Sequence, residues 1–201
     1  MSFVQCIPRF KGEFYRRNLS ENAQSVAIDV SDFGEYPYNL LSPFTFSTQF
    51  QIPVPGLEKV VAHSVEGIWQ GLRLIDGKSN YILFHQIADN KSVDNKERNR
   101  RDGKITGYQY GAEVLDEREA RWAIFIPSYT YYLNHFAPKD VIDSLLALQE
   151  KGKKLLVYDT KNNDDISNPE PYAHAAVLAS YLNLKIFNKN HQRRLERVSY
   201  D

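Results

Sequence analysis

The chain has 201 residues, and its 25 Lys and Arg are balanced by 25 Asp and Glu, so the formal net charge at pH 7 is zero. Hydrophobic residues make up 42% and aromatic residues 13% of the sequence, a composition that excludes intrinsic disorder. The zero net charge gives no electrostatic reason to expect general nucleic-acid binding, and no apolar run is long enough for a transmembrane helix. At roughly 150 residues per domain, we expect a single compact domain over residues 1–201.

The cysteine and histidine content limits the chemistry. Cys6 is the only cysteine, which excludes an internal disulfide framework and a cysteine-rich zinc site. The five histidines lack metal-ligand spacing, and the common phosphate-, dinucleotide- and metal-binding motifs are absent from the sequence, so we expect no metal and no cofactor. Charged residues occupy the N-terminal stretch where a secretion signal would be apolar. We therefore expect a cytoplasmic protein with no membrane partner.

The chain begins with a predicted strand and continues as irregular structure. Residues 26–31 alternate apolar and polar side chains, as a half-buried strand does. Residues 36–57 contain four prolines, which fix φ and remove backbone donors. This second segment is therefore predicted to be extended or looped.

The clearest element is a helix over residues 64–75. Ser64 is its candidate N-cap. Gly67 and Gly71 each cost up to about 1 kcal/mol of helix stability relative to Ala, so another backbone or a ligand is expected to pack closely against them. An apolar stripe at helical spacing should face the core, and it consists of Val65, Ile68, Trp69, Leu72 and Ile75.

The rest of the chain mixes helices and short strands. We expect a strand or buried segment at 80–87 and a polar surface loop at 88–104. Residues 112–126 should start as a charged helix and pass into an apolar stretch. The later predicted elements are a helix at 139–151 ended by Gly152, a buried strand at 154–159, a helix from Pro171 to about Leu182 and a peripheral tail at 188–201. This order lacks a regular βαβ rhythm, so it predicts an α+β fold that is rich in helices and has a small sheet.

The polar loop after the 154–159 strand is a first candidate site. It is not an EF-hand loop, because Lys161 and Asp164 stand where that loop needs an acidic or amide residue and a glycine. One interpretation is a solvated turn in which Asp and Asn side chains bond their own backbone. The alternative is a polar ligand site formed by Asp159 and Asp164, with His174 in the following helix.

Glu66 is the second candidate. A carboxylate in the first turn of a helix is stabilised by the helix dipole. Glu66 could also pair locally with Gln70 or Arg73. The alternative is that these three side chains form a polar line that faces a pocket. Trp69 and Trp122 are more often core residues than ligand platforms.

Several blocks of the sequence resemble known families. Ser42-Pro43-Phe44 and the segment SVEGIWQG from Ser64 resemble the opening of the NADAR (YbiA-like) superfamily. The chain looks more closely like an uncharacterised bacterial and phage family, in these two blocks and in four others: 28–30, 52–55, 120–129 and 159–175. Two departures from NADAR stand out. Gly67 follows Glu66 where NADAR proteins usually have His, and their C-terminal DxxWGxG pattern is absent from the sequence.

The resemblance implies a NADAR-like fold and N-glycosidase chemistry on a nucleotide or an ADP-ribosyl or phosphoribosyl derivative. Glu66 would be catalytic, with Asp159 and His174 as partner groups. The ligand-binding residues would be Trp69, Gln70, Arg73, Arg121, Trp122, Asn163 and Asp164.

Three expectations complete this hypothesis. Asp159 and Asn163 should lie near Glu66. The cluster Arg98, Arg100 and Arg101 would either meet phosphates or form a solvated loop. The partner would be a small nucleotide, with nucleic acid involved only through an ADP-ribosylated base. The alternative function is a non-catalytic binder that senses or sequesters such a nucleotide.

Overall fold

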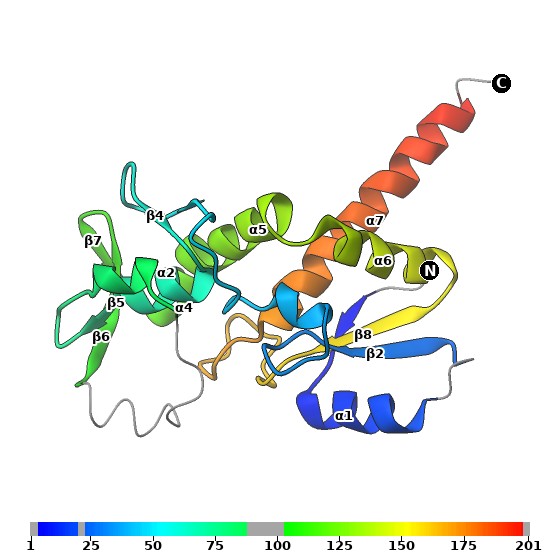
Figure 1. Cartoon of the computed structure of the whole chain (residues 1–201), viewed down its shortest axis with the longest axis horizontal. Helices are drawn as coiled ribbons and strands as arrows, with labels where there is room; N and C mark the ends of the chain where they lie inside the picture. Colours follow the sequence, from blue (N-terminus) through cyan, green and yellow to red (C-terminus); the bar gives the residue numbers. More distant parts are fainter. Residues whose placement is uncertain (1–3, 20–22, 88–102, 199–201) are drawn as a thin grey trace. The chain divides into compact units, whose positions relative to one another are not determined.

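The structure is a computed structural model that describes residues 4–19, 23–87 and 103–198. The chain forms two compact units, one from Met1–Leu40 and Pro138–Asp201 and the other from Leu41–Ala137. Each unit combines helices with small sheets (Figure 1). The predicted α+β class is therefore confirmed. A single domain over residues 1–201 stays a prediction, because compact packing alone does not show which parts fold independently.

The first unit is built on a three-stranded parallel sheet in the order β1-β8-β2. Its strands are β1 (Gln5–Cys6), β2 (Ser25–Asp29) and β8 (Lys154–Tyr158). The central strand is buried from Leu155 to Tyr158, as expected for a parallel sheet that is covered on both faces. The strands predicted at 26–31 and 154–159 are thereby confirmed.

Helices cover both faces of this sheet (Figure 1). α1 (Arg9–Asn18) lies on one face, and α6 (Lys139–Glu150) and α7 (His174–Val198) lie on the other. Gly12 permits the close approach of α1, because a Cβ at this position would overlap the ring of Tyr158. α6 confirms the helix predicted at 139–151, and Gly152 follows it with φ +78°.

The second unit is organised around α2 (Val65–Leu72). A 3₁₀ turn, η1 (Tyr38–Leu41), leads into the unit. Its strands form a pair, β3 (Ile52–Pro53) with β4 (Val61–Ala62), and an antiparallel sheet of β5 (Arg73–Ile75), β6 (Ile105–Tyr110) and β7 (Glu113–Leu115). Its remaining elements are a 3₁₀ turn, η2 (Tyr81–His85), a short helix, α4 (Glu117–Ala120), a π-helical turn, η3 (Arg121–Phe125), and a helix, α5 (Ile126–His135).

The predicted core stripe of α2 is confirmed. Val65, Ile68 and Leu72 are at most 1% exposed, and the ring of Trp69 packs 4.2 Å, centroid to centroid, from that of Tyr108. The helix ends at Leu72 instead of residue 75, because Arg73 turns to an extended conformation and begins a strand that pairs with β6.

Two predicted elements differ from the structure. The segment 80–87, predicted as a strand or buried segment, contains the 3₁₀ turn Tyr81–His85, and of its large apolar side chains Phe84 is buried whereas Ile82 and Ile87 are exposed. The helix predicted at 112–126 begins only at Glu117, because the residues before it form β7 in a hairpin with β6.

The last helix also differs from its prediction. It starts at His174 instead of Pro171, because Tyr172 is held in a parallel bridge with Asn163 and Ala173 N donates to the Asn163 carbonyl oxygen. It continues through the predicted tail as far as Val198. The loop cluster Arg98, Arg100 and Arg101 lies outside the described residues. None of the helices in the described part of the chain has the length and apolarity that a membrane crossing needs.

Candidate functional site

Glu66 lies in the first turn of α2 and is almost buried, with 8% of its surface exposed. The helix begins as the sequence predicts, since Ser64 Oγ accepts a hydrogen bond from Gly67 N at 3.0 Å. The backbone N of Glu66 donates to the carbonyl oxygen of Pro43 at 2.9 Å. The SPF block and the start of the helix are thus joined at the candidate catalytic residue.

The glycines of α2 allow η2 to approach this helix. A Cβ on Gly67 would lie 2.7 Å from the carbonyl oxygen of Leu83, and one on Gly71 would overlap the ring of Phe84. The expectation that another segment packs on these glycines is confirmed, and that segment is η2. Because η2 packs against Gly67 and Gly71, it restrains rotation of the helix and therefore the orientation of the polar side chains, which lie roughly 100° further round the helix.

The predicted polar line is present for Glu66 and Gln70, whereas Arg73 lies beyond the end of the helix. Gln70 Nε2 donates to Glu66 Oε1 at 2.5 Å, one helical turn away. Arg73 follows on β5 and forms a hydrogen bond with Tyr108 on β6. The Nε atom of Arg73 is buried without a hydrogen-bond partner among the described residues.

Tyr108 joins this polar line from β6. Burial raises the pKa of Tyr108 to about 12, the nearby Arg73 opposes that rise, and the carboxylates of Glu117 and Glu66 add to it. The phenol is therefore protonated at neutral pH and can act as a hydrogen-bond donor. Sequence analysis did not identify Tyr108 or Glu117, although the Ile, Thr and Tyr residues of 105–110 are a strand signal that would have found β6.

The remaining candidates of the second unit lie on or beside η3. Trp69 is partly buried between Tyr108 and Phe125. The Arg121 side chain is 3% exposed, and its Nη2 donates to Glu117 Oε1 at 2.9 Å. Trp122 is 58% exposed, so its interpretation as a core residue was wrong. An exposed indole next to a buried arginine remains available as a ligand platform.

In the first unit, Asp159 lies just beyond the carboxyl end of β8 and is 1% exposed. Its Oδ2 lies 2.9 Å from Nδ1 of His174 and accepts from Ala175 N at 3.0 Å. Its Oδ1 accepts from Lys161 N at 2.5 Å. This carboxylate therefore ties the end of a strand to the start of a helix.

The ring of His174 is held from both sides. Its Nε2 lies 2.9 Å from the carbonyl oxygen of Val30. A carboxylate and a carbonyl oxygen both accept hydrogen bonds, so this arrangement favours the doubly protonated imidazolium form of His174. Burial by itself would lower the pKa of His174, but Asp159, the Val30 carbonyl and Asp32 outweigh burial and raise it. Burial would likewise raise the pKa of Asp159, yet His174 and the backbone donors lower it.

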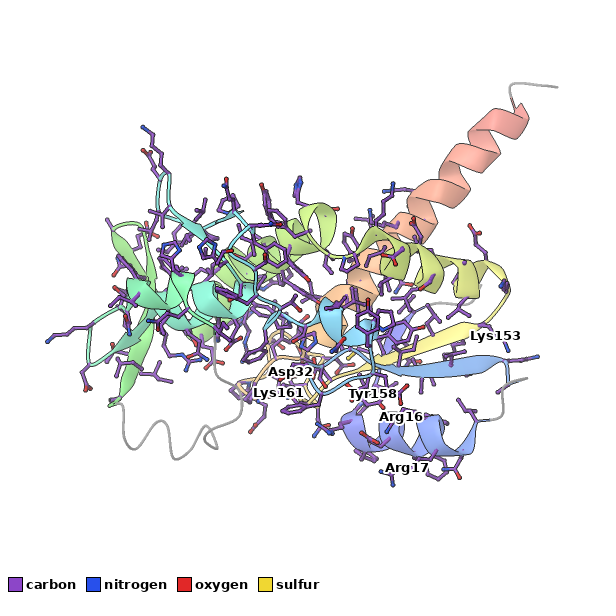
Figure 2. All side chains as sticks on the ribbon, in the orientation of Figure 1. Arg16, Arg17, Asp32, Lys153, Tyr158 and Lys161 are labelled. Atoms are coloured by element: carbon purple, nitrogen blue, oxygen red, sulfur yellow. The ribbon has the colours of Figure 1, made fainter. Side chains whose placement is uncertain are left out.

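Other polar groups gather at this end of the sheet. Asp32, which follows β2, and Lys161, which follows β8, both lie there (Figure 2). Burial, with Asp159 and Asp164 nearby, raises the pKa of Cys6 to about 12, so the thiol is protonated and is no nucleophile.

The loop after β8 is organised by the side chains of its own Asp and Asn residues. Asn163 is 7% exposed, donates through Nδ2 to the carbonyl oxygen of Glu170 at 2.6 Å, and accepts from Asp165 N at 3.0 Å. Asp165 and Asn168 make similar local bonds. These bonds are those of the turn interpretation, although Asp159 and Asn163 are buried instead of solvated. Asp164 is exposed.

The structure therefore brings the candidates together as two groups. Glu66, Gln70 and Arg73 form one group in the second unit, and Asp159, Asn163 and His174 form the other in the first. That Asp159 and Asn163 lie near Glu66 stays a prediction. Within residues 4–19, 23–87 and 103–198, no three His, Cys, Asp or Glu side chains converge as a metal site.

Comparison with known proteins identifies the family. The chain belongs to DUF6939, a family of unknown function, whose model matches residues 15–178. This match covers α2 and both groups of candidate residues. No curated protein and no solved structure matches the chain.

Proposed function

We propose that this protein is an N-glycoside hydrolase that releases the base from a nucleotide or from an ADP-ribosyl or phosphoribosyl derivative. The observation that carries the proposal is the state of Glu66, an almost buried carboxylate that Gln70 holds at 2.5 Å on a helix whose orientation is fixed by packing. The resemblance of SPF and SVEGIWQG to the NADAR superfamily supports the same residue.

The chemistry requires a negative charge near the sugar. As the N–C1′ bond breaks, its electron pair leaves with the base and positive charge develops on the ribosyl ring. Water then supplies the oxygen that bonds to C1′, and the proton that this water loses passes to the departing base or, where the base leaves as a neutral pyridine such as the nicotinamide of NAD, to solvent. A carboxylate in a low-dielectric site stabilises this positive charge more strongly than one in water. Glu66 would act in this way or as the base that activates the water.

Neighbouring groups of the second unit suit an anionic substrate. Arg73 carries a buried donor atom without a partner among the described residues, and Tyr108 is a protonated phenol hydrogen-bonded to it. Guanidinium groups recognise phosphates through paired donors. We therefore assign phosphate binding to Arg73 and base contact to the exposed ring of Trp122.

One observation favours the alternative of a non-catalytic nucleotide binder. Both nitrogens of His174 face oxygen acceptors, and Asp159 accepts from two backbone amides besides the imidazolium. His174 could protonate a leaving base only by giving up one of these bonds. A binder needs no such proton donor.

Replacement of Glu66 by Gln tests the proposal. Glu66→Gln keeps the shape of the side chain but removes its charge, and loss of one such electrostatic stabiliser slows a reaction by roughly 10²–10³. We expect the variant to fold and bind as wild type does, yet to release base at least about a hundredfold more slowly. A proton NMR time course with NAD, ADP-ribose and ribosyl-pyrimidine phosphates measures the release.

Glu58→Gln is the matched control, because Glu58 is an exposed carboxylate of the same unit. Its release rate should equal that of wild type. Line broadening without free base in the wild-type protein would support the binder instead. If Glu66→Gln releases base at the wild-type rate, Glu66 has no catalytic role and only interacts with the dipole of its helix.

A further inference from the structure

We propose that Gln70 is a positioning residue for Glu66, holding the carboxylate in one orientation and favouring its charged form. The inference rests on the proposed function of Glu66, and it changes the role of Gln70 from a ligand contact to a support of the catalytic group. Its basis is the hydrogen bond that Gln70 Nε2 donates to Glu66 Oε1 at 2.5 Å.

The geometry of α2 makes this bond a fixed feature of the unit. Glu66 and Gln70 are four residues apart and therefore neighbours on one face of the helix. On the glycine side, Gly67 and Gly71 lie directly against Leu83 and Phe84, so the helix cannot rotate without a clash. The polar pair can then reorient only through its own side-chain torsions, and the bond restrains those of both residues.

The direction of the hydrogen bond follows from the chemistry of the two groups. A carboxylate oxygen can only accept, so the amide of Gln70 must present its NH₂ group and not its oxygen. A donor aimed at a carboxylate favours the charged form of that carboxylate. A glutamate that stabilises positive charge on a sugar must be charged, so the same bond serves both position and charge.

Other groups near Glu66 act on its charge as well, and the experiment must separate their effects from that of Gln70. Tyr108 couples electrostatically to Glu66, Arg73 and Glu117. Several elements that adjoin α2 carry titratable or charged groups: Arg73 on β5, Tyr108 and Tyr110 on β6, Arg121 on η3, Tyr81 and His85 on η2, His63 after β4, and Tyr129, Tyr131, Tyr132 and His135 on α5. A variant that changes Gln70 alone leaves all of these in place.

Gln70→Met provides that variant, because methionine keeps the length and the helix propensity of glutamine but cannot donate. The carboxyl carbon of Glu66 is followed by ¹³C NMR during a pH titration, with its signal identified by its absence in Glu66→Gln. We expect the Glu66 pKa to be higher in Gln70→Met than in wild type by about one unit, a tenfold change in the ionisation constant. Gln51→Met, a change at an exposed glutamine of the same unit, should leave it unmoved.

Kinetics add a second measurement in the same variants. In the pH profile of base release, the acid limb should move to higher pH by the same amount as the NMR titration. We also expect kcat to fall about tenfold or more while KM changes little. A large rise in KM with kcat unchanged would show that Gln70 is a ligand contact, and this would overturn the inference.

The NMR titration does not depend on turnover, so failure of the inference and failure of the proposed function can be told apart. If the Glu66 titration moves in Gln70→Met but no compound releases base, the function is wrong and the positioning role stands. If it does not move, the positioning role is wrong whatever the activity. Should Gln70→Met fail to fold, Gln70→Leu replaces it, because leucine also cannot donate a hydrogen bond and should raise the Glu66 pKa in the same way. An unmoved titration in that variant would overturn the inference.

Discussion

Two buried carboxylates, Asp159 in the first unit and Glu66 in the second, are held in different ways. Asp159 accepts from the backbone of Lys161 and Ala175 and from the His174 imidazolium, so its bonds also join strand, loop and helix. Glu66 accepts from the side chain of Gln70 on its own helix. The bonds of Asp159 join three parts of the fold, whereas the bond from Gln70 to Glu66 lies within a single helix. This difference favours Glu66 over Asp159 as the group for the proposed chemistry.

Replacement of Asp159 should give the largest effect on stability. Asp159→Ala leaves the His174 imidazolium buried without its carboxylate, and breaking a buried pair in this way costs about 3–5 kcal/mol. We expect a loss of this size in the free energy of unfolding, measured by urea denaturation. Asp164→Ala, at an exposed aspartate of the same loop, should change it by less than about 0.5 kcal/mol. If the two variants lose the same free energy of unfolding, Asp159 contributes no more to stability than the exposed Asp164.

An alanine at Gly71 tests the packing that fixes the orientation of Glu66. The new methyl group would overlap the ring of Phe84, which is 1% exposed. Overpacking of this kind costs about 1–3 kcal/mol, whereas Gly to Ala at an open helical position stabilises by up to about 1 kcal/mol. The sign of the change in the free energy of unfolding therefore shows whether η2 packs against α2 at Gly71. A more stable Gly71→Ala would mean that η2 does not press against α2.

The pH dependence of unfolding should separate the His174–Asp159 pair from the rest of the first unit. The pKa of His174 is raised above 6.5, so its contribution is complete below that pH and is lost as pH rises through the folded value. The pKa of Asp159 is lowered below 3.8, so its contribution is lost as pH falls through its folded value. The pair should therefore stabilise most between these limits.

The measurement is a series of urea denaturations across that range and above it. On the alkaline side each pH unit should remove up to about 1.4 kcal/mol per proton until the folded His174 has lost its proton. His174→Gln should abolish this part of the dependence. If wild type and His174→Gln lose stability with the same slope at alkaline pH, a group other than His174 causes that loss.

Much of the local structure was predictable from short stretches of sequence. The stripe of Val65, Ile68 and Leu72, the Ser64 cap and the end of α6 at Gly152 each depend on residues a few positions apart, and all were predicted. Glu66 and Gln70 were placed on one face for the same reason. Residues 81–85 were predicted wrongly, because their conformation is set by packing on Gly67 and Gly71, which lie outside that segment.

The sequence by itself therefore determined α2, α6, the central strand β8 and the pairing of Glu66 with Gln70, since these follow from periodicity, capping and spacing along the chain. Only the tertiary structure decided which strands flank β8, because β1 and β2 come from the opposite end of the chain. It also decided that both nitrogens of His174 are engaged, since one of the acceptors is the carbonyl oxygen of Val30, 144 positions away. Contacts over such separations depend on how the whole chain packs, and no local pattern encodes them.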